Sequence, residues 1–181
     1  IRDQIRSGVK EDLQKLKKLG VNNLVVLSGD NQGTVDLVAH ELGLTEAHGH
    51  MLPEDKSAYI KTLQEKGQIV AFVGDGVNDS PSLALAQIGI AMGSGTDVAI
   101  ETSDVVLMNS DFSRLPHALG LTKATANNML QNIIIAVGVV LVLLASVFFS
   151  EWMNMSIGML VHEASILVVI LNAMRLLRYK L

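Results

Sequence analysis

Apolar and polar positions follow two periods along the first 110 residues, one typical of helices and one typical of buried strands. Val9, Leu13 and Leu16 recur at three- and four-residue intervals, which predicts an amphipathic helix over residues 8–20. Short, largely apolar runs predict strands at residues 24–27, 69–73, 88–91 and 104–108. Further helices are predicted over residues 32–42 and 53–67 and from residue 79 onward. This alternation predicts an α/β fold, a parallel sheet with helices on both faces.

The pattern changes in the last third of the chain. Residues 132–149 hold no charged side chain, and residues 153–174 form a second long, mainly apolar run. Each approaches the roughly 20 residues that a helix needs to cross a bilayer. Two such lengths in tandem rarely form a buried core hairpin in a domain this small, so we predict a transmembrane α-helical hairpin. The predicted domains are residues 1–110, a linking helix over 111–131, and the membrane part, 132–181.

Basic residues flank the predicted hairpin on both outer sides. Lys123 precedes the first span, and Arg175, Arg178 and Lys180 follow the second. Because positive residues favour the cytoplasmic side, we expect both ends of the hairpin to be cytoplasmic. The prediction is a multi-pass protein of the cell membrane, in contact with the lipid bilayer, with residues 1–131 and a carboxyl-terminal tail in the cytoplasm.

Composition and charge narrow the classes of function. The chain has 181 residues, of which 49% are hydrophobic, and a net charge of −4. It contains no cysteine, which excludes disulfides and thiolate metal ligands within it. It also has no basic stretch, so we predict no nucleic-acid partner. The chain begins in mid-pattern at Ile1 rather than at a methionine, and we expect it to be a piece of a longer protein.

The run Phe72–Pro81 (FVGDGVNDSP) carries the densest candidate chemistry. It places Asp75, Asn78 and Asp79 on a glycine-containing turn directly after a predicted strand. Their oxygens are hard ligands, as Mg²⁺ requires where it acts on phosphate. A dinucleotide fingerprint would need a third glycine where Asp79 stands. A simple helix cap would need one aspartate rather than three oxygen-bearing side chains. We therefore predict a site for a metal ion and a phosphoryl group.

Two more segments belong to the predicted site. Ser28, Gly29 and Asp30 follow the first strand, and strand ends of a parallel sheet meet at one edge, where ligands bind. A hydroxyl and backbone amides there can donate hydrogen bonds to a phosphoryl oxygen. Lys56, near a helix start, can neutralise developing negative charge, although a lone lysine there is more often solvated. Covalent phosphoryl transfer also needs a nucleophile, and none is evident in the chain.

These three segments together resemble the phosphorylation domain of P-type cation-transporting ATPases, which has the haloacid dehalogenase-like Rossmannoid fold. The resemblance is carried by Leu27–Asn31 (LSGDN), Pro53–Lys56 (PEDK) and Val73–Pro81 (VGDGVNDSP), and it extends over essentially the whole chain. A chain that ends two membrane helices after this domain looks like the heavy-metal branch. The resemblance implies a partial phosphorylation domain, with the phosphorylated aspartate, the nucleotide-binding domain and the other membrane helices upstream.

The resemblance also implies roles for individual residues. Asp75, with Asp79, would bind Mg²⁺, and Asn78 and Asp79 would organise the phosphate and metal site. Lys56 would stabilise the phosphoryl group. Ser28-Gly29-Asp30 would replace the family's Thr-Gly-Asp and keeps the hydroxyl. ATP would bind to the upstream domain, so the fragment alone would be inactive.

Three polar residues in the second predicted span are candidate ligands for a transported ion. His162, Glu163 and Ser165 lie near its middle, where ionisable groups are costly and usually functional. They resemble the His-Glu-Gly-Ser/Thr-Thr pattern of zinc, cobalt and iron exporters, from which Ala164 and Ile166 depart. The alternative is that His162 and Glu163 hydrogen-bond to neighbouring helices and only position those helices. Met155 and Met159 lie on one helical face, as copper ligands could, but methionines in such positions are more often packing residues.

The leading hypothesis is part of an ATP-driven exporter of a divalent heavy-metal ion such as zinc, cadmium, cobalt or iron, working through an aspartyl phosphate. A copper-transporting pump is a second possibility. A membrane-tethered regulatory module without catalysis is a third, favoured by the missing nucleophile. The four remaining histidines show no ligand spacing, and we interpret them as surface or structural residues: His40, His48, His50 and His117.

Overall fold

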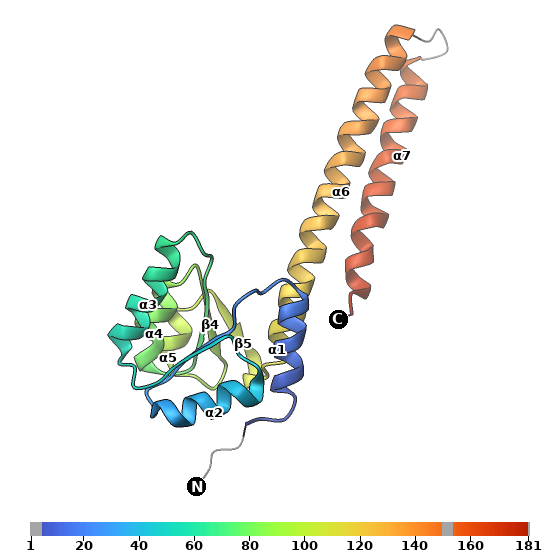
Figure 1. Cartoon of the computed structure of the whole chain (residues 1–181). Helices are drawn as coiled ribbons and strands as arrows, with labels where there is room; N and C mark the ends of the chain where they lie inside the picture. Colours follow the sequence, from blue (N-terminus) through green and yellow to red (C-terminus); the bar gives the residue numbers. More distant parts are fainter. Residues whose placement is uncertain (1–4, 150–153, 181) are drawn as a thin grey trace. The chain divides into compact units, whose positions relative to one another are not determined.

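The computed structural model describes residues 5–149 and 154–180, and the chain forms two compact units, residues 1–116 and 117–181. The first unit alternates strands and helices, and the second consists mainly of two long helices (Figure 1). The elements of the first unit are α1 (Val9–Lys18), β1 (Val25–Leu27), α2 (Gln32–Leu42), β2 (Glu46–His48), α3 (Pro53–Glu65), β3 (Ala71–Gly74), the 3-10 turn η1 (Val77–Asp79), α4 (Ser80–Leu85), β4 (Ile88–Met92), α5 (Asp97–Glu101), β5 (Val105–Leu107) and the 3-10 turn η2 (Met108–Ser110).

Every strand pairing in the described residues is parallel, which agrees with the predicted α/β class. The strands form two hydrogen-bonded ladders, β1-β2 and β3-β4-β5, where the sequence predicted a single sheet. Val25 pairs with Glu46 in the first ladder, and Ala71 pairs with Ile88 in the second. Within the part of the chain described, no ladder joins β1 to β3.

Burial of the strands follows this pairing. Ile90 and Ala91 of β4 are buried, because β4 has a neighbouring strand on each side. All three residues of β1 are only half-buried, and Ala71 at the start of β3 is exposed. Apolar strand residues are normally buried on both faces of a parallel sheet. Strands β1 and β3 therefore behave as edge strands in this chain.

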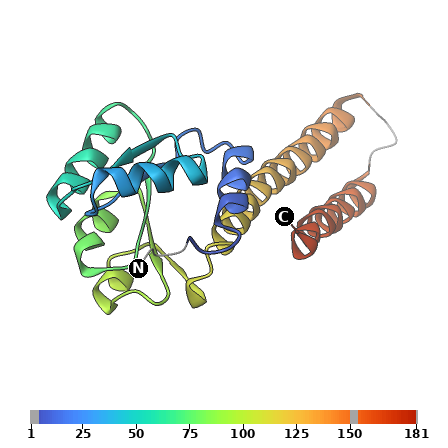
Figure 2. The same cartoon turned by 60° about the horizontal axis from the view of Figure 1, so that its bottom comes forward.

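Helices complete the core of the first unit. Figures 1 and 2 show α3, α4 and α5 along the same side of the strands. Ile60 of α3 and Leu83 of α4 are each 1% exposed, and the two helices pack together. Two side chains of α1, Leu13 and Leu16, are buried, which confirms the amphipathic helix predicted from the spacing, and α1 contacts α2.

The second unit contains α6 (Arg114–Phe149) from residue 117 onward, α7 (Met155–Met174) and a short 3-10 turn, η3 (Arg175–Arg178). Helix α6 is one continuous helix through the residues predicted as a separate linking helix, because no proline or glycine-rich break separates the amphipathic part from the apolar part. By length and composition alone, α6 and α7 are able to cross a membrane. Residues 150–153, between the two helices, lie outside the described residues.

Candidate functional site

The loop after β3 folds back so that the side chain of Asp79 lies against Gly74, the last residue of the strand. Strand β3 ends at Gly74, and the amide of Asp79 donates to the carbonyl of Gly76 at 3.0 Å. A Cβ atom on Gly74 would lie 2.7 Å from Cβ of Asp79 and 2.9 Å from its Oδ2, closer than real Cβ contacts come. Only glycine fits at position 74, and its lack of a side chain places the Asp79 carboxylate directly against the backbone.

Lys56 reaches this carboxylate from a different element. Its Nζ donates to Oδ1 of Asp79 at 2.8 Å, and both side chains are only 14% exposed. Lys56 lies in the first turn of α3, which begins at Pro53. That turn is fixed by the carboxylate of Asp55, which accepts a hydrogen bond from the amide of Leu52 at 2.9 Å. The structure thus brings together two predicted site residues that are 23 positions apart.

The other two oxygen-bearing residues of the loop, Asp75 and Asn78, are exposed. The backbone carbonyl of Asp75 accepts from the amide of Thr96 at 3.1 Å, and the hydroxyl of Thr96 in turn accepts from the amide of Ala99 at 3.3 Å as the cap of α5. The backbone at Asp75 is therefore held by the start of α5, while its carboxylate faces solvent.

The donor set of this loop fits Mg²⁺. Lys56 contacts Oδ1 of Asp79, whereas Oδ2 lies over Gly74, and the carboxylate of Asp75 and the amide of Asn78 are accessible. Carboxylates and an amide oxygen, with water completing the shell, are what Mg²⁺ takes at phosphate sites. Asp75 and Asp79 are the residues that would hold the ion, beside the ammonium group of Lys56.

The segment of Ser28, Gly29 and Asp30 forms a second turn, after β1. The Ser28 hydroxyl accepts from the amide of Asp30 and donates to Oδ2 of the same residue, both at 3.1 Å. The turn is also tied to the segment before α3. The amide of Met51 donates to the carbonyl of Ser28 at 3.0 Å, and the amide of His50 donates to the carbonyl of Asp30 at 2.7 Å.

The predicted site residues thus fall into two bonded pairs, Ser28 with Asp30 and Lys56 with Asp79. Residues 50–56 connect them, because Met51 holds the first turn and Lys56 belongs to the second pair five residues later. The structure gives no direct hydrogen bond between the two pairs among the described residues. The roles assigned to these residues stay predictions.

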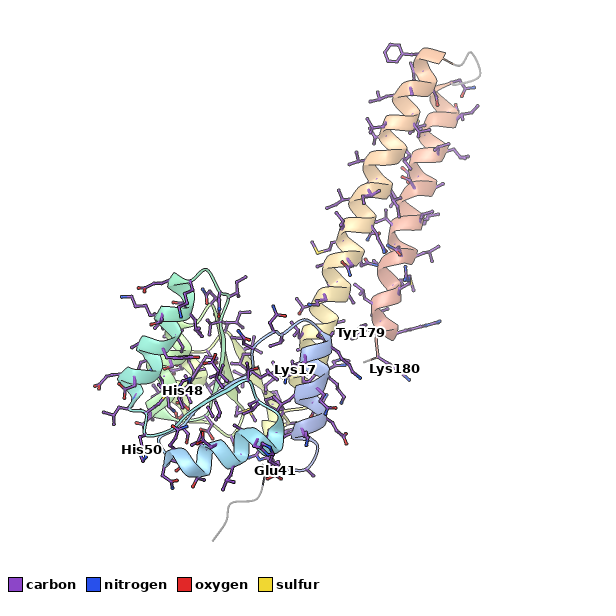
Figure 3. All side chains as sticks on the ribbon, viewed as in Figure 1. Lys17, Glu41, His48, His50, Tyr179 and Lys180 are labelled. Carbon is purple, nitrogen blue, oxygen red and sulfur yellow. The ribbon has the colours of Figure 1, made fainter. Side chains whose placement is uncertain are left out.

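Sequence reasoning missed the residues that support this connection. The side chain of Gln32 donates to the carbonyl of Ala47 at 3.0 Å and accepts from the amide of Gly49 at 2.6 Å. These bonds fix the start of α2 to the end of β2 and to the residue after it, beside His48 and His50, which Figure 3 labels. A Cβ atom on Gly49 would lie 2.8 Å from the backbone of Gln32. In the sequence, only Gly49, between His48 and His50, could have indicated this close contact.

A second support links β2 to α3. The hydroxyl of Tyr59 on α3 donates to Oε2 of Glu46 at 2.7 Å, and the ring of His48 lies against that of Tyr59 with centroids 4.8 Å apart. Burial, and then the hydrogen bond to Glu46, raise the pKa of Tyr59 to about 12. The hydrogen bond from Tyr59, followed by that from His48, lowers the pKa of Glu46.

The candidate ligands in the second unit all lie on α7. His162 and Glu163 are exposed, and the hydroxyl of Ser165 donates to the carbonyl of His162 at 2.6 Å. Adjacent helical residues point about 100° apart, so His162 and Glu163 face different directions. No cluster of three His, Asp or Glu side chains occurs in the described ranges. The role of these residues stays a prediction.

Comparison with known proteins agrees with these features. Residues 1–87 match the haloacid dehalogenase-like hydrolase family. The chain is 40% identical to a cadmium-transporting ATPase of Staphylococcus aureus over 181 residues, and 40% identical to a zinc-transporting ATPase of Bacillus subtilis over 178 residues. The alignments cover 99% and 98% of this chain and 25% and 28% of those proteins.

A solved structure is similar along both units of the chain. The crystal structure of a zinc-transporting PIB-type ATPase in the E2.Pi state matches with a TM-score of 0.83 and 36% identity, covering 97% of this chain and 28% of that one. This chain therefore spans about a quarter of the length of the curated relatives it matches. The resemblance read from the motifs is confirmed, as is the predicted fold class.

Proposed function

We propose that this chain, which contains a haloacid dehalogenase-like domain and two apolar helices similar to those of heavy-metal P-type ATPases, is part of an ATP-driven exporter of a divalent heavy-metal ion. The observation that carries the proposal is the contact between Lys56 and Asp79 at 2.8 Å, on a glycine loop that also presents Asp75. The loop after β3 therefore carries two carboxylates, and the first turn of α3, which contacts this loop, carries one ammonium group.

These residues would act on a phosphoryl group by charge and position. Lys56 would stabilise negative charge that develops on the equatorial phosphoryl oxygens, and Asp79 would hold the lysine in place. From the second turn, the amide of Gly29 would donate to a phosphoryl oxygen, and so would the Ser28 hydroxyl once it turns away from Oδ2 of Asp30. Bound Mg²⁺, held by Asp75 and Asp79, would supply further charge neutralisation at the same oxygens.

The phosphorylated aspartate would come from an upstream segment of the intact protein. Support comes from β1 and β3, each of which has a strand partner on one side only among the described residues, and whose apolar residues are half-buried or, at Ala71, exposed. A parallel strand supplied between them would pair with both edges, complete the burial and bring its carboxyl end to the two turns. The buried hydroxyl of Ser80, which has no hydrogen-bond partner in the described residues, also fits a site completed by another segment.

The membrane part would carry the ion. The support is the length and apolar character of α6 and α7 and the names of the relatives, which transport cadmium or zinc. The ion would be the substrate, bound with the help of His162, Glu163 and Ser165 and of ligands on other helices. The first unit and the end of α7 would face the cytoplasm, where ATP is available.

The test is ATP hydrolysis by the intact protein in lipid vesicles, measured with Zn²⁺, Cd²⁺, Co²⁺, Fe²⁺ and Cu⁺ in turn. We expect stimulation by at least one divalent ion and an acid-stable, hydroxylamine-sensitive phosphoprotein. Stimulation by Cu⁺ alone would instead support a copper pump, and no phosphoprotein with any ion would support a regulatory module. Glu163→Gln should abolish stimulation, and unchanged stimulation would make this carboxylate a packing residue.

A further inference from the structure

A cluster of side-chain amides joins α6 to α7 near the carboxyl-terminal end of α7. Asn128 on α6 donates to the main-chain carbonyl of Asn172 on α7 at 2.8 Å. The side-chain amide of Asn172 donates back to Oδ1 of Asn132 at 2.9 Å and to Oε1 of Gln131 at 3.3 Å. Figures 1 and 2 show the two helices side by side within this unit. We call these four residues the amide cluster.

The cluster occupies one face of α6. Positions 128, 131 and 132 are spaced by three and four residues, so their side chains lie on the same side of the helix. Asn128 is 7% exposed, whereas the neighbouring Asn127 is exposed. Two neighbouring asparagines therefore differ in burial. The burial of Asn128 follows from its contact with α7 and not from its residue type.

The hydrogen bonds within the cluster are mutually consistent. Asn132 donates to Oδ1 of Asn128 at 3.2 Å, and Arg175 donates to Oδ1 of Asn172 at 2.9 Å. The side-chain oxygens of the cluster are therefore engaged as acceptors, and a guanidinium group already donates into it. A cation would have to displace these donors beside a positive charge, so the cluster is unsuited to binding an ion.

The position of the cluster also fixes the end of α7. The carbonyl of Asn172 lies in the last turn of the helix, where it accepts from the amide of Arg175, and Asn128 supplies a second donor from the other helix. Beyond it, the rings of His117 and Tyr179 lie 5.6 Å apart, centroid to centroid, and Figure 3 labels Tyr179 and Lys180 at this end. Two contacts in succession thus hold the end of α7 to α6.

We propose that the amide cluster is a positioning device, which locks the axial register of α7 against α6 so that a displacement of α6 moves both helices together. Helix α6 is continuous with residues 114–116 of the first unit, so a movement generated there reaches α6 through the chain itself. The amide cluster then transmits it to α7, which carries His162 and Glu163. This inference rests on the proposed function.

The first test compares ion transport with ATP hydrolysis in the intact pump, reconstituted in vesicles. We expect Asn172→Leu to keep ion-stimulated phosphorylation and to lower the number of ions moved per ATP about threefold, the scale of one lost interhelical hydrogen bond. Asn127→Leu, on the exposed face, is the matched control and should leave the ratio unchanged. Asn132→Leu should lower the ratio, and the double variant should be no worse than Asn172→Leu, because both act in one network.

Three results would each overturn the positioning role of the amide cluster. They are an unchanged number of ions per ATP in Asn172→Leu, an equal decrease in Asn127→Leu, and additive losses in the double variant. A second measurement is independent of pump activity. In the full 181-residue chain in lipid nanodiscs, the side-chain amide protons of Asn128 should exchange with solvent about fivefold more slowly than those of Asn127, as one net hydrogen bond implies. Equal exchange rates would contradict the positioning role of the amide cluster. Wild-type protein that is not phosphorylated would contradict the proposed exporter function and leave the positioning role to the exchange measurement.

Discussion

The ammonium group of Lys56 lies 2.8 Å from Oδ1 of Asp79 and joins the first turn of α3 to the loop after β3. Both side chains are 14% exposed, so the pair is shielded from solvent on most sides. Charge-assisted hydrogen bonds of this kind are stronger than neutral ones, and losing one partner leaves the other charge unpaired. The pair therefore has a structural role as well as the proposed one at the phosphoryl group.

Replacing the lysine should reveal both roles. We expect Lys56→Met to lower the free energy of unfolding by about 2 kcal/mol, because the Asp79 carboxylate loses its charged partner. Urea denaturation of the full chain in detergent measures this change. Lys61→Met, at an exposed position of the same helix, should change the free energy by no more than about 0.5 kcal/mol. Equal effects of the two substitutions would contradict the assigned contact.

The glycines of the loop should differ sharply in their tolerance of a methyl group. Gly74→Ala would place Cβ 2.7 Å from Cβ of Asp79, so we expect a loss of about 1–3 kcal/mol and a displaced carboxylate. At Gly76 the nearest atom to an added methyl group would be 3.9 Å away, and the φ of −115° suits any residue. Gly76→Ala should therefore fold normally. Thermal unfolding of both variants tests the difference, and equal stability would show that Asp79 does not lie under Gly74.

The sequence predicted the strands and turns that carry the site, and it failed where structure depends on distant partners. The strand predicted over residues 69–73 begins at Ala71, because pairing with β4 starts there and leaves Ile69 81% exposed. Strand β2 has three residues and no apolar periodicity, so only its pairing with β1 defines it.

The candidate site shows the same division. The turns that contain Ser28 and Asp79 were predicted to lie at one edge of the sheet, where the ends of parallel strands meet, and Lys56 was assigned to the same site. The structure brings Lys56 into contact with Asp79. Gln32 was not predicted, because its role depends on a loop 15 and 17 residues away, and glutamine has no sequence signature for such bonds. The amide cluster of α6 and α7 was also missed, since asparagines near the end of a predicted span carry no helical-face signal until their partner helix is in place.

The phenol of Tyr59 should titrate unusually late. Burial and the hydrogen bond to Glu46 raise its pKa from 10.0 to about 12. A pKa that is higher in the folded state gives a stabilising contribution that is fully present below about pH 10 and is lost as the pH rises through 12. Phenolate absorbance of the folded chain, which has two tyrosines, should show one late step.

Two variants identify that late step. Tyr59→Phe should remove it, and Glu46→Gln should move it to lower pH, because the charged acceptor that favours the protonated phenol is lost. Glu41→Gln, an exposed carboxylate on α2, should leave the step unchanged. A late step that persists in Tyr59→Phe would assign the raised pKa to the wrong residue.

Phosphorylation of Asp75→Asn in the intact protein tests the central claim most directly. The substitution keeps the size of the side chain and the backbone bond to Thr96, and it removes one negative charge from the proposed Mg²⁺ site. With the transported ion present, we expect phosphoprotein formation from ATP to fall at least about 100-fold, while binding of the ion is unchanged and Glu101→Gln, an exposed control, behaves as wild type. Phosphorylation of Asp75→Asn at the wild-type level would contradict the account.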